Sequence, residues 1–354
     1  MSPSKDKLTV IDAPLDPDER EPRVLEKIQH AQNNYRDLPY TNPCQGVLSN
    51  LSRPIKPLHL EVEPWLLPAP PPDYLFMVTV ANYVSFIDSG GCREYADQLA
   101  QLVHSILPHK PLTIGVDHTL TGGPVQAISE EVDPSELTLI VLDCHLDAIP
   151  TSIRLGLIHY DLETNPNTIF DPHDPYIYNR AESYNPESFL LYLLEEGIVY
   201  PENTFIVGVA DYPPRTAMQM EDERVKRYVD HYLGIIEKGV HLLRKEDIAK
   251  HKDKLLSLKN DVSTRYVYIS IDLDVGANAT LYGVRHSDRT GLTLRDLRAV
   301  VDSLIALFKD GRELMGLDLM EIDIYRAGLT YHGRQDRTYQ IAAEIASRFA
   351  DFLS

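Results

Sequence analysis

The stretch LTLIVLDCHLD, residues 137–147, joins a continuous apolar run to a cluster of acidic and imidazole side chains. The stretch YVYISIDLD, residues 266–274, has the same form. Continuous apolar runs of this kind are typical of strands that are buried on both faces of a parallel sheet. Polar residues two positions apart at a strand end project from one face and can converge on one point. Four carboxylates and an imidazole gathered there would repel one another unless a multivalent cation lay between them. These residues are Asp143, His145, Asp147, Asp272 and Asp274.

From residue 74 onward, apolar strand patterns alternate with helical patterns, which predicts a mostly parallel central sheet in a three-layer α/β/α domain spanning residues 1–354. A first strand is expected at Leu8–Pro14 and a first helix at Val24–Tyr35. The further expected strands are Tyr74–Val80, Leu112–Val116, Leu137–Asp143, Thr204–Val209, Val240–Arg244, Tyr266–Asp272 and Leu314–Glu321. The further expected helices are Arg93–Leu107, Pro186–Glu196, Thr216–Glu237, Lys245–Ser257, Leu294–Phe308 and Tyr339–Phe352. In such folds ligands bind outside the carboxyl ends of the strands, where both acidic clusters are expected.

The segment 36–72 is rich in proline and cannot hold long regular structure. It carries Trp65, Leu66 and Leu67, so we expect it to pack over the core or a partner subunit.

Composition limits the partners and the location. A formal net charge of -19 argues against nucleic acid and against anionic membrane surfaces as partners, and it is compatible with a small cationic substrate. The sequence shows neither a signal-like start nor an apolar stretch of membrane-spanning length, so a cytoplasmic location is expected. Three cysteines suggest no disulfide framework.

A third polar element, Gly115-Val116-Asp117-His118-Thr119, also follows an expected strand. A lone histidine after a strand is more often a structural residue than a ligand, and aspartates there often cap a helix. Capping explains one aspartate in a loop but not a pair at positions i and i+2. Hard oxygen ligands mixed with imidazole suit Mn²⁺ better than Zn²⁺, Co²⁺ or Ni²⁺.

These three motifs resemble, in order and spacing, those of the ureohydrolase family, which includes arginase, agmatinase, guanidinobutyrase and formimidoylglutamase. The resemblance covers roughly residues 112–328 and implies an arginase-like fold with two Mn²⁺ ions per chain in a homo-trimer or hexamer. It implies that one ion is held by His118, Asp143, Asp147 and Asp272, and the other by His145 and Asp274, with Asp143 and Asp272 bridging. Two ions lower the pKa of water and supply hydroxide at neutral pH, and Asp147 would accept a hydrogen bond from it.

Two more residues match the family pattern. His159, in Gly156-Leu157-Ile158-His159, resembles the histidine that carries protons beside the metals, although an exposed loop histidine is an equally good interpretation. Glu321, at the end of the last strand, resembles the glutamate that pairs with a planar substrate cation. The resemblance therefore implies catalytic roles for His159, Asp147 and Glu321.

Departures from the family pattern concern the substrate. The loop 275–290 is rebuilt, and the expected pocket loop 148–158 has Ile149, which cannot hydrogen-bond an α-carboxylate. The segment around Asp211 keeps only one of two family aspartates that can hold an α-amino group. Both changes favour agmatine and an agmatinase-like role in polyamine metabolism, whereas Arg154 could clamp a carboxylate and favour 4-guanidinobutyrate or formimidoyl-glutamate. Arginase activity, another dimetal hydrolase and a catalytically silent homologue remain as alternatives.

Overall fold

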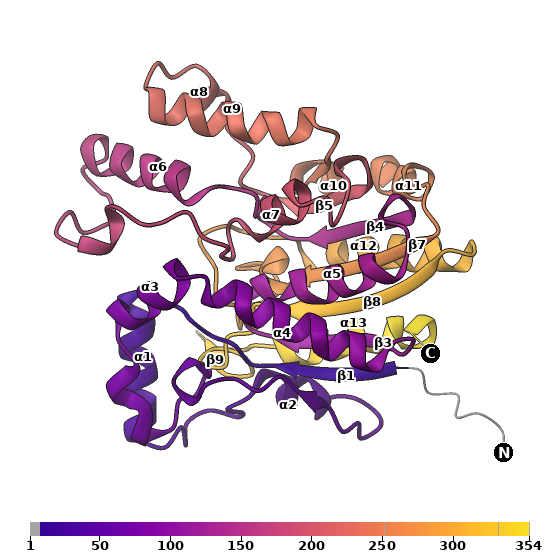
Figure 1. Ribbon diagram of the computed structural model, residues 1–354, viewed down its shortest axis with the longest axis horizontal. Helices are drawn as coiled ribbons and strands as arrows, with labels where there is room; N and C mark the ends of the chain where they lie inside the picture. Colours follow the sequence, from indigo (N-terminus) through magenta and orange to yellow (C-terminus); the bar gives the residue numbers. More distant parts are fainter. Residues whose placement is uncertain (1–7, 251, 332, 354) are drawn as a thin grey trace.

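The computed structural model describes residues 8–250, 252–331 and 333–353, and within them a central sheet of eight parallel strands carries the fold (Figure 1). The strand order is β2-β1-β3-β8-β7-β4-β5-β6. The sequence prediction of a mostly parallel α/β sheet is confirmed. The strands of the sheet are β1 (Leu8–Ala13), β2 (Leu58–His59), β3 (Lys110–Gly115), β4 (Leu137–Leu142), β5 (Thr204–Val209), β6 (His241–Arg244), β7 (Tyr266–Asp272) and β8 (Glu313–Met320). A separate antiparallel pair is formed by β9 (Thr330–Tyr331) and β10 (Arg334–Gln335).

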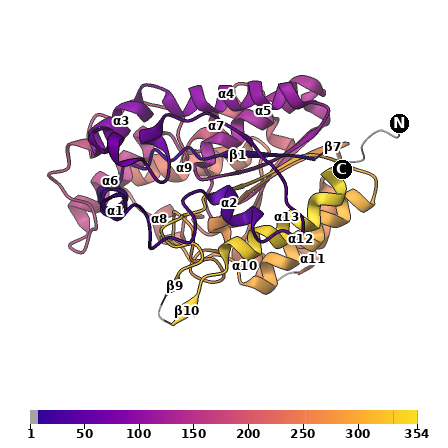
Figure 2. The ribbon, with the colours of Figure 1, turned by 90° about the horizontal axis from the view of Figure 1, so that it is seen from below.

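Helices cover both faces of this sheet, as Figure 2 shows. The α-helices are α1 (Glu21–Gln32), α2 (Pro43–Leu48), α3 (Val80–Asp88), α4 (Gly91–Ile106), α5 (Gly122–Glu131), α6 (Thr151–Thr164), α7 (Phe189–Glu195), α8 (Arg215–Met218), α9 (Glu223–Glu237), α10 (Lys245–Lys250), α11 (Lys252–Asp261), α12 (Leu294–Lys309) and α13 (Thr338–Leu353). Buried residues of α2 and α10 to α13 pack on one face, and those of α3, α4, α5, α7 and α9 pack on the other. Within the described residues, no helix has the length and apolar content needed to cross a membrane.

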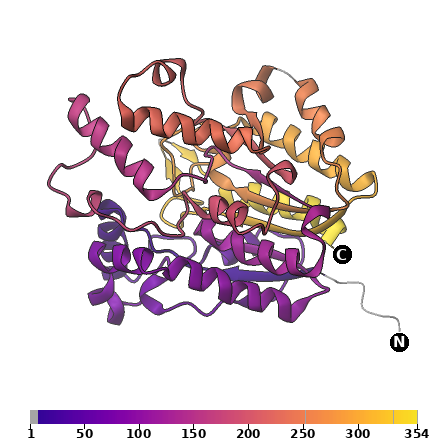
Figure 3. The same ribbon diagram turned by 45° about the horizontal axis from the view of Figure 1, so that its top comes forward.

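The register of the central strands brings their carboxyl ends level with one another. Leu142 of β4 pairs with Ile271 of β7, and Ile271 pairs with Leu319 of β8. The next residue of each strand or loop is therefore placed at the same edge of the sheet. This edge lies on the left in Figure 1, and α6 extends beyond it in Figures 1 and 3.

The proline-rich segment 36–72 holds only short elements, as expected. They are α2, β2 and a 3₁₀ turn at Pro64–Leu66. Leu66 is 1% exposed and packs in the same core cluster as β1 and α4, so this segment covers the sheet.

Three sequence predictions for local structure are wrong. The expected strand Tyr74–Val80 is a 3₁₀ helix, Pro72–Met77, followed by α3, whose first turn is capped by Thr79. The expected helix Thr216–Glu237 is interrupted because the side chain of Asp222 caps α9 through the backbone N–H of Arg224.

The third difference affects the site, because the expected loop 148–158 is largely helical. It forms the first half of α6, which begins directly after Pro150 and packs against α9. Proline fixes an extended conformation just before the helix starts, which the apolar pattern alone did not indicate.

Candidate metal centre

Four neighbouring strands supply the polar residues at the carboxyl edge of the sheet. His118 follows β3, Asp143 to Asp147 follow β4, Asp272 and Asp274 close β7, and Glu321 follows β8. The sequence prediction placed these residues at strand ends, and the strand order makes the four ends adjacent. Seven side chains meet in one region as a result: His118, Asp143, His145, Asp147, Asp272, Asp274 and Glu321.

The first group consists of His118, Asp143, Asp147 and Asp272, whose ligand-type atoms all lie within 4.8 Å of one another. Nδ1 of His118 is 2.9 Å from Oδ2 of Asp147, 3.1 Å from Oδ2 of Asp272 and 3.4 Å from Oδ2 of Asp143. All four residues are buried. This is the set that the family resemblance implies for one ion.

The second group shares Asp143 with the first and adds Cys144, His145 and Asp274. Nδ1 of His145 is 2.9 Å from Oδ2 of Asp274 and 3.5 Å from Oδ1 of Asp143. The motifs read from the sequence assigned no role to Cys144. Burial raises the pKa of its thiol well above the ordinary value, and its Sγ donates to Oδ1 of Asp274 at 3.2 Å. Cys144 therefore acts as a hydrogen-bond donor that positions Asp274.

Both imidazoles are oriented through Nε2, the nitrogen that faces away from the carboxylates of the two candidate ligand groups. Nε2 of His118 is 3.0 Å from Oγ of Ser270, and Ser270 donates at 2.7 Å to the buried carboxylate of Asp318. Since the serine proton goes to Asp318, Ser270 accepts from Nε2–H of His118. Nε2 of His145 lies 3.2 Å from Oδ1 of Asp288. Hydrogen bonds of this kind fix the ring so that Nδ1 can act as a ligand.

The residues present fit bound divalent cations. Oδ2 of Asp143 and Oδ2 of Asp274 are buried. Nδ1 of His118 and Nδ1 of His145 lie 3.4 Å and 2.9 Å from them, but neither contact has the geometry of a hydrogen bond, although buried carboxylate oxygens are nearly always satisfied. Burial works against charging the imidazoles, but the surrounding carboxylates raise the pKa of His118 and His145 well above the ordinary value. Protons on these rings therefore compensate the carboxylates when cations do not. The mixed oxygen and nitrogen donor set suits Mn²⁺ and related ions.

A family model described as the arginase family matches residues 77–350, which is most of the chain. This chain belongs to the arginase family. Relatives with established names include arginase 2, chloroplastic/mitochondrial, of Arabidopsis thaliana, which is 24% identical over 268 residues, 76% of this chain and 60% of that protein. Arginase 1, mitochondrial, of Oryza sativa subsp. japonica is 26% identical over 56% of this chain and 45% of its own length. The chain thus spans about half to 60% of the length of these relatives.

Solved structures show the same fold at lower identity. Proclavaminate amidino hydrolase from Streptomyces clavuligerus has a TM-score of 0.57 at 17% identity, covering 97% of this chain and 90% of that one. Arginase from Bacillus subtilis has a TM-score of 0.56 at 18% identity, covering 97% and 98%. Formimidoylglutamase from Bacillus subtilis has a TM-score of 0.53 at 14% identity, covering 97% and 86%. The fold is therefore that of the arginase family, whereas these identities leave the substrate open.

Glu321 lies beside the metal centre of this arginase-family fold, and its carboxylate is already engaged. Oε1 accepts from the backbone N–H of His118 at 3.3 Å, and Oε2 is 3.1 Å from Nδ1 of His286 and 3.9 Å from Nε of Arg285. Burial alone would raise the pKa of Glu321, but Arg285 and His286 bring it down to about 2. Glu321 is therefore ionised at neutral pH. Sequence reasoning marked residues 275–290 as rebuilt but did not foresee that Arg285 and His286 would reach Glu321.

Two of the acidic residues hold a strained backbone. Asp147 has φ of 50° and Glu321 has φ of 64°. Both lie in the left-handed region, which residues other than glycine rarely adopt. Such conformations persist where the surrounding structure enforces them, and they cluster at functional sites. The two strained residues thus lie at the candidate metal centre, Asp147 in one ligand group and Glu321 beside it.

His159 is held away from the two ligand groups. It lies on α6, where its Nε2 is 3.0 Å from the carbonyl oxygen of Ile177 and its ring stacks on Tyr178 with centroids 4.7 Å apart. Within the described residues, no hydrogen bond or ring contact joins His159 to the metal-binding groups. By contrast, the ring of His286 lies 6.4 Å from that of His145. The role of His159 as proton carrier stays a prediction. His286 is the imidazole that the fold brings to the site.

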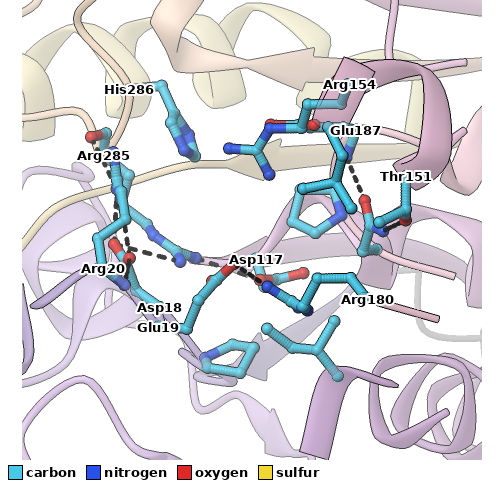
Figure 4. A pocket seen from close by; sticks show the side chains of 15 residues that line it. Asp18, Glu19, Arg20, Asp117, Thr151, Arg154, Arg180, Glu187, Arg285 and His286 are labelled. Atoms are coloured by element: carbon cyan, nitrogen blue, oxygen red, sulfur yellow. Dashed lines mark hydrogen bonds and ion pairs between the residues drawn. The ribbon is translucent and has the colours of Figure 1, made fainter. Parts of the chain in front are cut away.

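A cleft of about 60 Å³ is lined in part by Arg285 and His286, the two residues whose side chains lie beside the carboxylate of Glu321, and is shown in Figure 4. Charged residues of both signs line it, and several of them form ion pairs, some with residues outside the lining. Arg154 is 2.8 Å from Glu187, and Arg180 contacts Asp88 at 2.8 Å. The charged and imidazole residues of the lining are Asp18, Glu19, Arg20, Asp117, Arg154, Arg180, Glu187, Arg285 and His286.

Proposed function

We propose that this protein is a dimanganese hydrolase that cleaves a C–N bond of a guanidino or amidino compound. The observation that carries the proposal is the pair of largely buried groups sharing Asp143, placed at the ends of β3, β4 and β7 of an arginase-family fold. In this proposal His118, Asp143, Asp147 and Asp272 hold one Mn²⁺, and His145 and Asp274 hold the other. Asp143 and Asp272 would bridge them, and a trimer or hexamer in the cytoplasm is the expected working form.

The two cations would supply hydroxide near neutral pH by lowering the pKa of bound water. The side chains of the protein then have separate tasks. Asp147 would accept a hydrogen bond that orients the attacking oxygen. Glu321, ionised and 3.3 Å from the backbone of His118, would accept N–H groups of the substrate. The departing amine needs a proton, and the candidates are His159, from the family resemblance, and His286, from its position.

Agmatine is our first candidate substrate. Ile149 is buried, and its backbone N–H donates to the carbonyl of Glu187, so it offers nothing to an α-carboxylate. Asp211 is engaged by Leu146 and Tyr232 rather than turned toward a ligand. Arg154 has Glu187 as its partner, so clamping a substrate carboxylate would require breaking that pair. Glu187 pairs with Arg154 through Oε1, so its Oε2 would accept the ammonium tail of agmatine without breaking that pair.

The direct test combines metal content with a substrate panel. Protein loaded with Mn²⁺ is given agmatine, arginine, 4-guanidinobutyrate and formimidoyl-glutamate, and both urea and formamide are measured. Urea from agmatine, lost in Asp272→Asn, is the expected result. Formamide as the sole product would overturn the guanidino assignment, and turnover of none of the four by metal-loaded protein would overturn the proposed function.

A further inference from the structure

Arg285 brings a guanidinium group of the protein itself into the region beside Glu321. Its side chain is only 6% exposed and is surrounded by four carboxylates. Nη1 is 3.2 Å from Oδ2 of Asp117, and Nη2 is 3.4 Å from Oδ1 of Asp16 and 3.5 Å from Oδ2 of Asp18. Nε is 3.9 Å from Oε2 of Glu321. Figure 4 shows this guanidinium next to Asp117.

The backbone fixes Arg285 in this place. Its N–H donates to the carbonyl of Glu321 at 3.1 Å, within a local antiparallel bridge between Val284 and Ile322. Its own carbonyl accepts from Nη2 of Arg20 at 3.3 Å and from Nη2 of Arg23 at 3.2 Å. Arg285 is therefore a built-in part of the site, and it does not have the free backbone that a plug or lid would need.

This arrangement changes what Glu321 can offer to a substrate. A planar cation binds a carboxylate best through two parallel N–H bonds to its two oxygens. Here Oε1 is used by the backbone of His118, and Oε2 is shared with His286 and Arg285. A guanidinium that approached Glu321 would also meet the positive charge of Arg285 at close range, and like charges placed side by side are an effective means of rejecting a partner.

One donor of Arg285 has no partner. Its Nε is buried and makes no hydrogen bond, while it faces Oε2 of Glu321 at a distance too long for a direct one. A buried N–H without an acceptor is costly, so an acceptor atom between Arg285 and Glu321 would be favourable. Guanidinium and amidinium groups supply only donors. A ureido or carboxamide group supplies one carbonyl oxygen for Arg285 and one N–H for Glu321.

We propose that Arg285 is a specificity-determining residue that weakens the capture of a cationic guanidinium at Glu321 and favours a neutral ureido group there. The inference rests on the proposed function only for the location of the reacting end of the substrate beside the metal centre. With agmatine as substrate, Arg285 keeps its affinity lower than Glu321 alone would give.

A matched pair of ligands tests this. Agmatine and N-carbamoylputrescine share one tail and differ in carrying a guanidinium or a ureido group. Their dissociation constants are determined by rapid mixing with the metal-loaded protein, from binding in the first milliseconds before agmatine is hydrolysed, so that the result reports binding and not turnover. We expect Arg285→Gln to shift the ratio of the two affinities toward agmatine by about tenfold or more. The variant loses both the charge that repels a guanidinium and the Nε–H that would donate to the ureido carbonyl. Arg180→Gln is the control, since Arg180 lines the same cleft but pairs with Asp88, and it should leave the ratio within about threefold.

Removing Arg285 leaves its carboxylates without their cation, which can destabilise the fold. The double variant Arg285→Gln with Asp117→Asn removes one charge of each sign and should show the same shift in the ratio. An unchanged ratio in both Arg285 variants, or binding of neither ligand by them, would overturn the inference. A shifted ratio in a protein that hydrolyses none of the panel substrates would support the role of Arg285 while refuting the proposed hydrolase function.

Discussion

Asp143 is the residue whose replacement tests the metal centre most sharply, because it belongs to both ligand groups. Its Oδ1 accepts the backbone N–H of His145 at 2.6 Å, whereas its Oδ2 is buried and accepts no hydrogen bond. Asparagine keeps the shape and the first contact but replaces a negative ligand atom with an amide. Losing a residue that merely orients a ligand typically costs about 10–100-fold in metal affinity, so losing this ligand should cost at least about 100-fold.

The loss can be expressed as stability. At a free Mn²⁺ concentration about 100 times the dissociation constant, one site stabilises the folded protein by about 2.7 kcal/mol. A site that is 100-fold weaker contributes only about 0.4 kcal/mol at that concentration. For a chain of this size about 1 kcal/mol corresponds to about 1.3 °C in Tm, so the metal-induced rise in Tm should shrink by about 3 °C per affected site.

The assay is thermal unfolding of Asp143→Asn and wild type, each with Mn²⁺ and with a chelator, together with metal content after gel filtration. Asp230→Asn, on the exposed face of α9, serves as the control and should keep the full metal-induced rise. If Asp143→Asn retained both metals and the full rise in Tm, the assignment of the two groups would be refuted.

The other predictions concern single roles around this centre. Glu321→Gln should leave metal content unchanged and raise KM about tenfold or more, because an amide lacks the charge-assisted contact; an unaltered KM would remove Glu321 from substrate binding. His286→Ala should lower kcat about 100-fold, whereas His159→Ala should leave kcat near wild type, since His286 is the ring that lies beside Glu321. If His159→Ala lowered kcat more than His286→Ala did, His159 would be the proton carrier instead. Metal binding should strengthen as pH rises from 6 to 8, because the raised pKa values of His118 and His145 keep these rings protonated in the metal-free protein and protons must leave before the nitrogens can bind metal. Calorimetry in buffers of different ionisation enthalpy should therefore record proton release, and its absence would contradict the ring assignment.

The clustering of the six candidate ligand residues could be predicted from sequence because their geometry is local to strand ends. Asp272 and Asp274 are two residues apart at the end of β7, and the parallel sheet brings that end next to β4. The partners of Glu321 could not be predicted in this way. Arg285 lies 36 positions earlier in the chain, and its contact depends on the bridge between Val284 and Ile322, which no periodic pattern indicates.

The position of His159 shows a second limit. A motif match identifies an equivalent residue type, but it does not predict the backbone conformation around that residue. The loop expected before His159 is part of α6, and a helix turns each side chain by the helical period, which here directs the ring to Tyr178. The contact of Cys144 could not be predicted for a simpler reason. A buried thiol that donates one hydrogen bond produces no recognisable spacing pattern in the sequence.

The left-handed backbone at Asp147 and Glu321 has a consequence for how this chain would evolve in the laboratory. Glycine adopts that conformation without a steric penalty, whereas another residue in a sparsely populated region gives up about 1 kcal/mol or more. A library screened only for folded, heat-resistant protein would therefore accumulate glycine at these two positions. A library screened for turnover would keep both carboxylates and accept the lower stability. The residues recovered at 147 and 321 would thus report which pressure had been applied.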